Sequence, residues 1–266
     1  DFVYLTLLAE LFDNPGFSEL ARARYDALRA NAGSAQVLAE QTRDERHAAG
    51  DDGLILYDLA WQTLGAAALD RVFSAAGYDA DADTFAAVAS ADLGSSTPLF
   101  DSSDPSEAFY THGLAWSLIV LSRDPAQAAR LASTRARLLD RQHPDGAWDW
   151  NSDYPEDDIQ ATAHATTALM LAADSDLQSW AAAARGALWL IDHQTTSGGW
   201  VRADGIETPQ VDADAMLAIY LVASGPGSDQ LGLHADATEA LALSSAARAA
   251  SAGPPPSAAP NPHAHR

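Results

Sequence analysis

Two stretches of the sequence share one pattern: RLLDRQHPDGAW at residues 137–148 and RGALWLIDHQTTSGGW at residues 185–200. In each stretch an amphipathic run ends on a glutamine, and a glycine and a tryptophan follow. The two copies are 52 residues apart at three matched pairs: Gln142 and Gln194, Gly146 and Gly198, and Trp148 and Trp200. A fixed period of about this length, with a helical hairpin in each unit, is typical of a stacked or circular helical array.

The glutamine, glycine and tryptophan of each copy have a structural interpretation. A glutamine at the end of one helix can hydrogen-bond the free backbone groups in the first turn of the next helix. Glycine allows the chain to turn tightly, and tryptophan can pack against the neighbouring repeat. We therefore predict that one set of residues clamps adjacent hairpins together: Gln142, Trp148, Gln194, Gly198 and Trp200.

Helix signals dominate the rest of the chain. Three stretches have the composition of capping boxes, with a polar cap followed by Glu or Gln: Asp104 with Glu107, Asp124 with Gln127, and Ser175 with Gln178. Alternating runs of β-branched residues, which would predict strands, are nearly absent. The sequence therefore predicts an all-α protein.

The predicted helices form pairs. We expect five hairpins: 2–12 with 17–30, 54–76 with 81–91, 105–122 with 125–142, 157–173 with 176–194, and 209–224 with 234–250. In the third and fourth pairs the first helix is apolar nearly all round, whereas the second is amphipathic. A helix that is apolar all round must be covered on most sides, so first helices should form an inner layer wrapped by second helices.

These pairs predict an α/α toroid built of about five helical hairpins over residues 1–250. The chain begins inside an apolar run, so we expect the ring to be incomplete at its N-terminal side. Residues 251–266 are rich in proline and alanine and predict a disordered tail.

The stretch from Arg185-Gly186 through Gln194 to Gly198-Gly199-Trp200 resembles the QW motif of the prenyltransferase and squalene oxidase repeat family. Residues 137–148 resemble a second, partial copy, and the similarity covers about residues 105–225. The resemblance implies a terpenoid-cyclase-like toroid with a central cavity. Some proteins of this architecture use cysteine to bind zinc or to form a thioester. The sequence has 0 cysteines, which excludes these activities.

The resemblance implies a place for the acid of a class II terpene cyclase, which protonates an alkene from an Asp-x-Asp-Asp-Thr-Ala stretch. Here VDADAML at 211–217 has Asp212 and Asp214 at the first and third positions, but Ala215 replaces the final Asp. Catalysis by this resemblance would use Asp214 as the acid, Asp212 as its partner and Asp158 as a further carboxylate. Because the motif is incomplete, we expect it to be degenerate. The alternative is that these aspartates cap inner helices.

Four other side chains are candidates for lining the cavity: His112, His164, Trp148 and Trp150. The two histidines lie 52 residues apart in apolar segments, so they either face the cavity or are hydrogen-bonded core residues. Trp148 can serve in packing instead, whereas Trp150 has no counterpart in the next repeat. We find no motif with metal-ligand spacing, and we predict no metal and no cofactor.

The charge restricts the partners. The chain has a formal net charge of −22, from 37 acidic and 15 basic residues, and every basic residue is arginine. This field repels phosphates, so we expect no nucleic-acid partner. No uncharged apolar run reaches the ~18 residues of a membrane helix, so we expect no transmembrane segment. An acidic, lysine-free surface is typical of proteins adapted to high salt, or simply of acidic proteins from GC-rich genomes.

Three functions remain open from the sequence. The first is a terpenoid-cyclase-like repeat protein with a small hydrophobic ligand. The second is a glycosidase or polysaccharide lyase on a helical toroid, with a glycan ligand, because DWNSDYPEDD at 149–158 supplies both carboxylates and aromatic residues. The third is a non-catalytic scaffold that binds a ligand or a partner.

Overall fold

The computed structural model describes residues 14–74, 77–95, 98–172, 176–202 and 205–225. Helices make up most of these residues, which confirms the all-α prediction. The predicted helices at 2–12 and 234–250, and the predicted tail at 251–266, lie outside the described residues.

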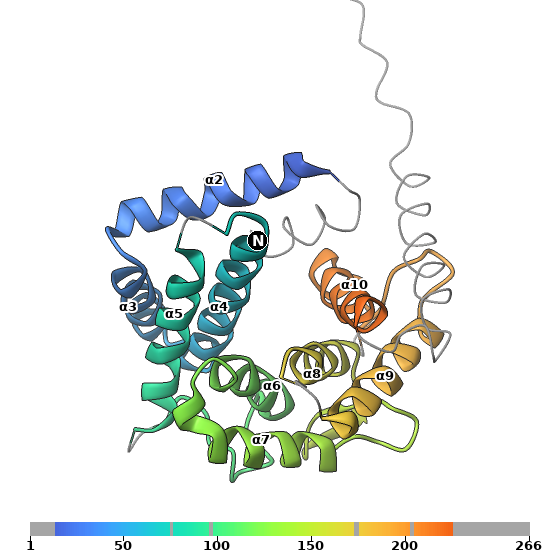
Figure 1. Ribbon diagram of the computed structural model, residues 1–266. Helices are drawn as coiled ribbons and strands as arrows, with labels where there is room; N and C mark the ends of the chain where they lie inside the picture. Colours follow the sequence, from blue (N-terminus) through green and yellow to red (C-terminus); the bar gives the residue numbers. More distant parts are fainter. Residues whose placement is uncertain (1–13, 75–76, 96–97, 173–175, 203–204, 226–266) are drawn as a thin grey trace, which may run out of the picture.

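The described helices follow one another in chain order (Figure 1): α2 (Pro15–Ala32), α3 (Ala35–Ala49), α4 (Ile55–Val72), α5 (Tyr78–Leu93), α6 (Tyr110–Leu121), α7 (Ala128–Asp140), α8 (Ile159–Leu171), α9 (Leu177–Asp192) and α10 (Pro209–Ser224). Two short 3-10 helices, η1 (Asp52–Leu54) and η2 (Pro125–Gln127), precede α4 and α7. Two short strands, β1 (Asp149–Asn151) and β2 (Tyr154–Asp157), form an antiparallel hairpin before α8.

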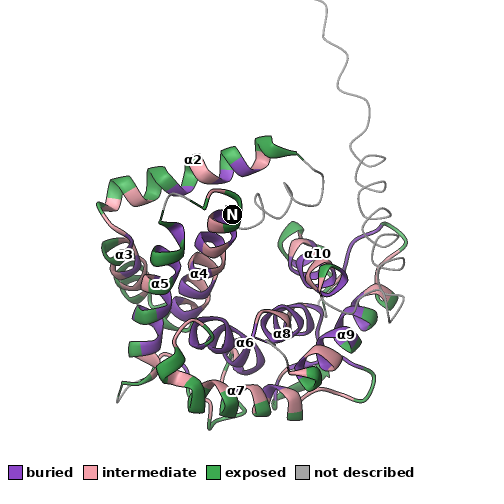
Figure 2. Cartoon of the chain, viewed as in Figure 1, coloured by how far each residue is buried: buried purple, intermediate pink, exposed green. Residues whose placement is uncertain are grey.

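The helices are arranged in an inner row with outer helices around it. Helices α4, α6, α8 and α10 pack side by side in that order, and α5, α7 and α9 each pack against the inner helix that precedes them in the chain. Burial follows the same division (Figure 2): every residue of α6 is buried, whereas α7 buries only Thr134 and Leu138. The first helix of each pair is therefore the inner one.

The apolar core is divided between two clusters. The larger draws residues from α2 through α10 and includes Trp148, and the smaller joins α8, α9 and α10 with Trp200. Both tryptophans have an exposed fraction of 0%. Each cluster therefore contains the tryptophan of one copy of the repeated motif.

Helix α3 was not predicted, although its caps can be read in the sequence. The Ser34 hydroxyl accepts a hydrogen bond from the Val37 amide at 3.2 Å, and Gly50 ends the helix with φ of +77°. Within the helix only Ala35 and Ala39 are buried. The helix consists mostly of polar residues and alanines, so the apolar periodicity that predicts a helix is weak there.

Two of the three predicted capping boxes were wrong in detail. Asp104 accepts from the Ser106 amide at 3.0 Å in a turn, and the helix begins later, at Tyr110. Asp176, rather than Ser175, caps α9 by accepting from the amides of Gln178 and Ser179 at 3.3 and 3.2 Å; Ser175 lies outside the described residues. In the third box Asp124 is an N-cap as predicted, but it caps the short helix η2 that precedes α7.

The two copies of the repeated motif form equivalent turns. The indole Nε1 of Trp148 donates to the Leu138 carbonyl at 2.8 Å, and that of Trp200 donates to the Leu190 carbonyl at 2.7 Å. The side-chain amides of Gln142 and Gln194 donate to Gly146 and Gly198, the carbonyls within their own turns, at 2.9 and 3.0 Å. Both glycines have positive φ, +105° and +85°, where a larger residue would be strained.

The contacts of Gln142 extend to the next outer helix. Its amide also donates to the Ala182 carbonyl of α9 at 2.8 Å, and its oxygen accepts from Arg185. The expected partner, the first turn of the following inner helix, is instead capped by Asp158. Gly186 of α9 gives the Trp148 ring its space, since a Cβ there would come within 2.9 Å of it. The first turn therefore joins two outer helices.

Candidate functional site

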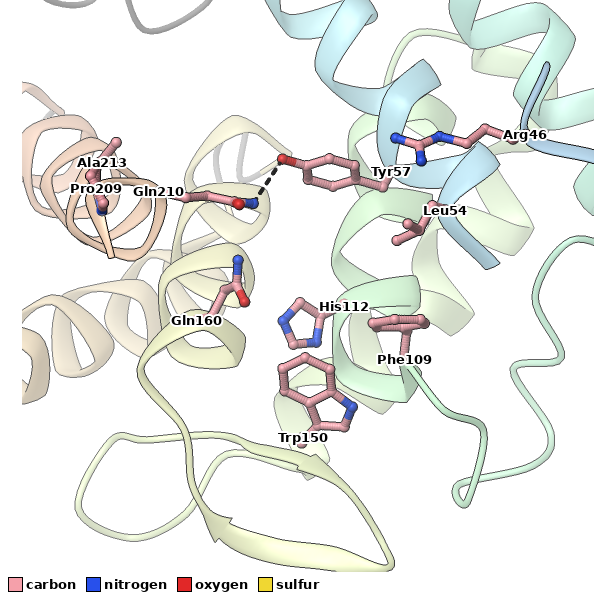
Figure 3. A pocket seen from close by; sticks show the side chains of 10 residues that line it. All are labelled: Arg46, Leu54, Tyr57, Phe109, His112, Trp150, Gln160, Pro209, Gln210 and Ala213. Atoms are coloured by element: carbon pink, nitrogen blue, oxygen red, sulfur yellow. Dashed lines mark hydrogen bonds between the residues drawn. The ribbon is translucent and has the colours of Figure 1, made fainter. Parts of the chain in front are cut away.

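The inner helices surround a cavity of about 570 Å³ near the beginnings of α4, α6, α8 and α10 (Figure 3). Side chains from six segments line it: Arg46 of α3, Leu54 and Tyr57 at the start of α4, Phe109 and His112 at the start of α6, Trp150 of β1, Gln160 of α8, and Pro209, Gln210 and Ala213 of α10. Ligand sites in proteins are commonly concave and largely apolar, with a few polar groups. This cavity has that composition.

One wall of the cavity is aromatic. The ring of Trp150 lies 4.3 Å from that of His112 and 5.5 Å from that of Phe109, measured between centroids. The indole N–H of Trp150 donates to the Ala108 carbonyl, which fixes the ring over the start of α6. The β hairpin thus brings to the cavity the tryptophan that had no counterpart in the repeat.

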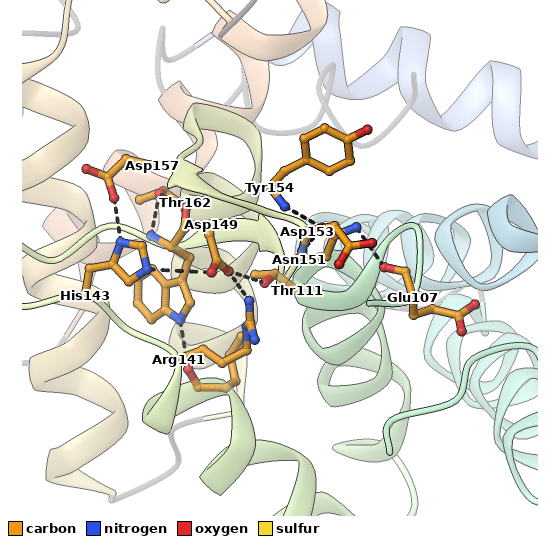
Figure 4. Close-up of polar contacts among 12 residues, drawn as sticks. Glu107, Thr111, Arg141, His143, Asp149, Asn151, Asp153, Tyr154, Asp157 and Thr162 are labelled. Carbon is orange, nitrogen blue, oxygen red and sulfur yellow. Dashed lines mark hydrogen bonds and ion pairs between the residues drawn. The ribbon is translucent and has the colours of Figure 1, made fainter. Parts of the chain in front are cut away.

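The β hairpin is itself held against the loop before α6 (Figure 4). The Asn151 side chain accepts from the amides of Asp153 and Tyr154, both at 3.0 Å, and donates to the Glu107 carbonyl at 3.1 Å. The Ser152 amide donates to the Pro105 carbonyl at 2.8 Å. These bonds determine where β1 places Trp150.

His112 is a neutral imidazole in the cavity wall. Its exposed fraction is 1%, and neither ring nitrogen has a hydrogen-bond partner among the described residues. Burial, with a smaller contribution from nearby His164, lowers the pKa of His112 well below its ordinary value of 6.5. A neutral imidazole offers one donor and one acceptor.

His164 lies behind the cavity wall and belongs to a chain of polar contacts. Its Nδ1 accepts from the Trp116 indole at 3.2 Å, so its proton is on Nε2, which lies 3.3 Å from Oδ2 of Asp214 without the alignment of a hydrogen bond. The same carboxylate accepts from the Gln160 side chain at 3.0 Å. This chain links α6, α8 and α10, and Gln160 is the member of it that reaches the cavity.

Neither Asp158 nor Asp212 lines the cavity, because each carboxylate bonds a backbone amide. Asp158 caps α8 and accepts from the Ala161 amide at 2.7 Å, and burial raises its pKa. Asp212, in the first turn of α10, accepts from the Trp200 amide at 2.8 Å. Asp158 therefore caps a helix, which was the predicted alternative to a catalytic role. Asp212 does not cap α10 but bonds the backbone of the turn that precedes it.

The repeat is 50 residues long when it is counted from the helix caps rather than from the tryptophans. Asp158 and Thr208 are the N-caps of α8 and α10, and the connection from the tryptophan to the cap is two residues shorter in the second copy. Counting from the caps gives other pairs than the 52-residue offset did: Thr162 with Asp212, and His164 with Asp214. The Trp148 amide accordingly donates to the Thr162 hydroxyl at 3.0 Å.

The structure divides the four predicted cavity residues. His112 and Trp150 line the cavity, whereas His164 lies behind its wall and Trp148 packs between outer helices. Gln160 and Gln210 were missed, although each stands two residues after an N-cap. Tyr57 was missed as well, and its hydroxyl accepts from Gln210 at 3.2 Å, a contact between residues 153 apart.

A second polar group lies at the end of α7. Ligand atoms of His143, Asp145 and Asp157 all fall within 4.8 Å of one another. His143 bonds Asp157 at 2.6 Å through Nδ1, and its Nε2 lies 3.7 Å from Asp149, which also pairs with Arg141 (Figure 4). Because these contacts tie the β hairpin to α7, we assign the group a structural role.

No family model matches the sequence, and no curated protein matches it either. The resemblance to the prenyltransferase and squalene oxidase repeat family therefore stays a prediction. Every helix among the described residues is too short or too polar to span a bilayer.

Proposed function

We propose that the chain is a terpenoid-cyclase-like α/α toroid whose cavity binds a small hydrophobic ligand without cyclase chemistry. The toroid is supported by the row of inner helices and by the Tyr57–Gln210 hydrogen bond, which joins the first and last of them. The ligand is supported by one observation above all. The cavity is lined by aromatic and neutral side chains together with Arg46, and none of its described lining side chains is a carboxylate.

Cyclase chemistry requires an acid in contact with the alkene. Asp158 and Asp212 are both committed to backbone amides, and Asp214 meets His164 and Gln160 instead of the cavity. The cavity therefore supplies an aromatic surface but no proton donor of the required strength. Binding is the activity that these residues support best.

The same observation bears on the carbohydrate alternative. Glycosidases need two carboxyl groups on either side of the bond that they cleave. The described cavity wall supplies no such pair, and its one cation, Arg46, bonds Asp58 at 2.6 Å. Because the described lining lacks the carboxyl pair that glycan cleavage requires, we favour the hydrophobic ligand.

The proposal is tested by titrating the protein with farnesol, a fifteen-carbon prenyl alcohol, and separately with cellotriose, and following tryptophan fluorescence. We expect saturable binding of farnesol and none of cellotriose. Trp150→Ala should weaken farnesol binding about tenfold, since it removes an aromatic wall. Trp180→Ala, on the outer helix α9, is the matched control and should bind as the wild type does.

Each alternative has its own outcome. Saturation by cellotriose and not by farnesol would favour the glycan alternative. Binding of neither probe would leave the scaffold alternative, in which the cavity has no ligand of these classes.

A further inference from the structure

His112 is the polar side chain of the cavity whose hydrogen-bonding capacity is unused. It is 1% exposed, it lines the cavity, and neither Nδ1 nor Nε2 meets a partner among the described residues. Nearly all buried polar groups in proteins have a hydrogen-bond partner, because leaving one unpaired costs free energy. A side chain that departs from this rule in the wall of a cavity points to a partner that enters the cavity.

The surrounding polar groups are already engaged. The Trp150 indole donates to the Ala108 carbonyl, and the Trp116 indole donates to His164. The amide nitrogen of Gln160 is directed to Asp214, and that of Gln210 to Tyr57. Each of these groups therefore has a partner within the protein, and Figure 3 shows the bond between Gln210 and Tyr57.

We propose that His112 is the polar anchor of the cavity and that it binds a hydroxyl group carried by the hydrophobic ligand. This inference rests on the proposed function and names the ligand class within it, a neutral terpenoid alcohol in place of a bare hydrocarbon.

A hydroxyl is the group that suits a neutral imidazole in either tautomer. It donates to an unprotonated ring nitrogen or accepts from a protonated one, whereas a carbonyl can only accept. A carboxylate would need a cationic partner, and His112 is held neutral by burial and by its proximity to His164, whose ring centroid lies 5.0 Å away. The rings of Trp150 and Phe109 next to it offer the apolar surface for the carbon skeleton.

The test compares two probes that differ by the hydroxyl, farnesol and the hydrocarbon farnesene, on three proteins. Wild type should bind farnesol about tenfold more tightly than farnesene, the difference that one hydrogen bond supplies. In His112→Phe this preference should disappear, with farnesene affinity kept. His193→Phe, which replaces a histidine stacked on Trp189 at the end of α9, should keep the wild-type preference.

A second measurement does not depend on a variant. In wild-type protein with 15N-labelled histidine, farnesol should shift the ring nitrogens of one imidazole, and farnesene should not. This readout decides the question if His112→Phe fails to fold.

The outcomes separate the inference from the proposed function. Equal binding of both probes to the wild type, or a preference that survives in His112→Phe, would overturn the role of His112 and leave the hydrophobic cavity in place. A farnesol complex without any histidine shift would overturn it too. Binding of neither probe would overturn the proposed function together with this inference.

Discussion

The two turns that carry the repeated motif share their structure but differ in what they bring to the cavity. In the first, between α7 and α8, and in the second, between α9 and α10, the tryptophan is buried and bonded to the carbonyl ten residues earlier. The first turn then has two more residues before the next N-cap, and its β hairpin carries Trp150 to the cavity. The second turn has the exposed Arg202 at the matching position. The motif fixes the turn, and the connection after it determines the contribution to the cavity.

The turns also use different side chains for one backbone contact. The amide of the first tryptophan donates to the Thr162 hydroxyl, and that of the second donates to the Asp212 carboxylate. Thr162 in the first copy therefore makes the same contact as Asp212 in the second, the aspartate that resembled a catalytic residue. This equivalence indicates that Asp212 holds the turn in place.

The largest expected effect tests whether the two turns are equally important. Trp148→Ala and Trp200→Ala should each lower the free energy of unfolding by about 3–5 kcal/mol, because each deletes a fully buried aromatic side chain from its cluster. Urea unfolding followed by circular dichroism measures both. A loss below about 1 kcal/mol at either site would show that its tryptophan is not a clamp, and the comparison would fail at that turn.

A smaller effect should distinguish the first turn by its close packing against α9. Gly186→Ala should destabilise the protein by about 1–3 kcal/mol, because the new Cβ would lie 2.2 Å from the Thr166 hydroxyl and 2.9 Å from the Trp148 ring. In an open helix the same change is stabilising by about 1 kcal/mol. The sign of the change in urea midpoint therefore decides whether the contact is as tight as described.

Local patterns in the sequence predicted the parts of the fold that depend on local contacts. The spacing from Gln142 to Trp148 indicated a turn, and the apolar character of residues 110–121 indicated an inner helix; both are present. The β hairpin was not predicted, because strands of three and four residues are too short to show alternation. Helix α3 was missed because alanines supply its buried face.

The site was harder to predict because it depends on register and on distant segments. The candidate carboxylates were chosen by resemblance to a motif, and counting from the N-caps of α8 and α10 instead matches Asp212 with Thr162 and Asp214 with His164. The Tyr57–Gln210 contact joins residues 153 apart, and no local pattern reveals such a pair. Trp150 could be recognised as the residue that breaks the repeat.

The smallest expected effect concerns His112, the titratable group on the cavity side of the first turn. Burial holds its pKa well below 6.5, so at mildly acidic pH the unfolded chain binds a proton there that the folded chain does not. Stability therefore rises with pH across this window and falls on acidification. The contribution of His112 between pH 6.5 and pH 5.5 should be a loss of about 1 kcal/mol.

Unfolding in urea at several pH values, for wild type and His112→Phe, isolates this contribution from those of the other ionisable groups. The loss on acidification should be smaller in His112→Phe by about 1 kcal/mol, whatever the offset between the two curves. The control is His193→Phe, at the end of α9 beside the second turn. This variant keeps the His112 imidazole, so its loss of stability on acidification should still include the His112 contribution. Parallel curves for wild type and His112→Phe would mean that the imidazole is protonated as easily in the folded chain as in the unfolded one. The cavity wall beside the first turn would then not be dry and neutral, and this difference between the two turns would be lost.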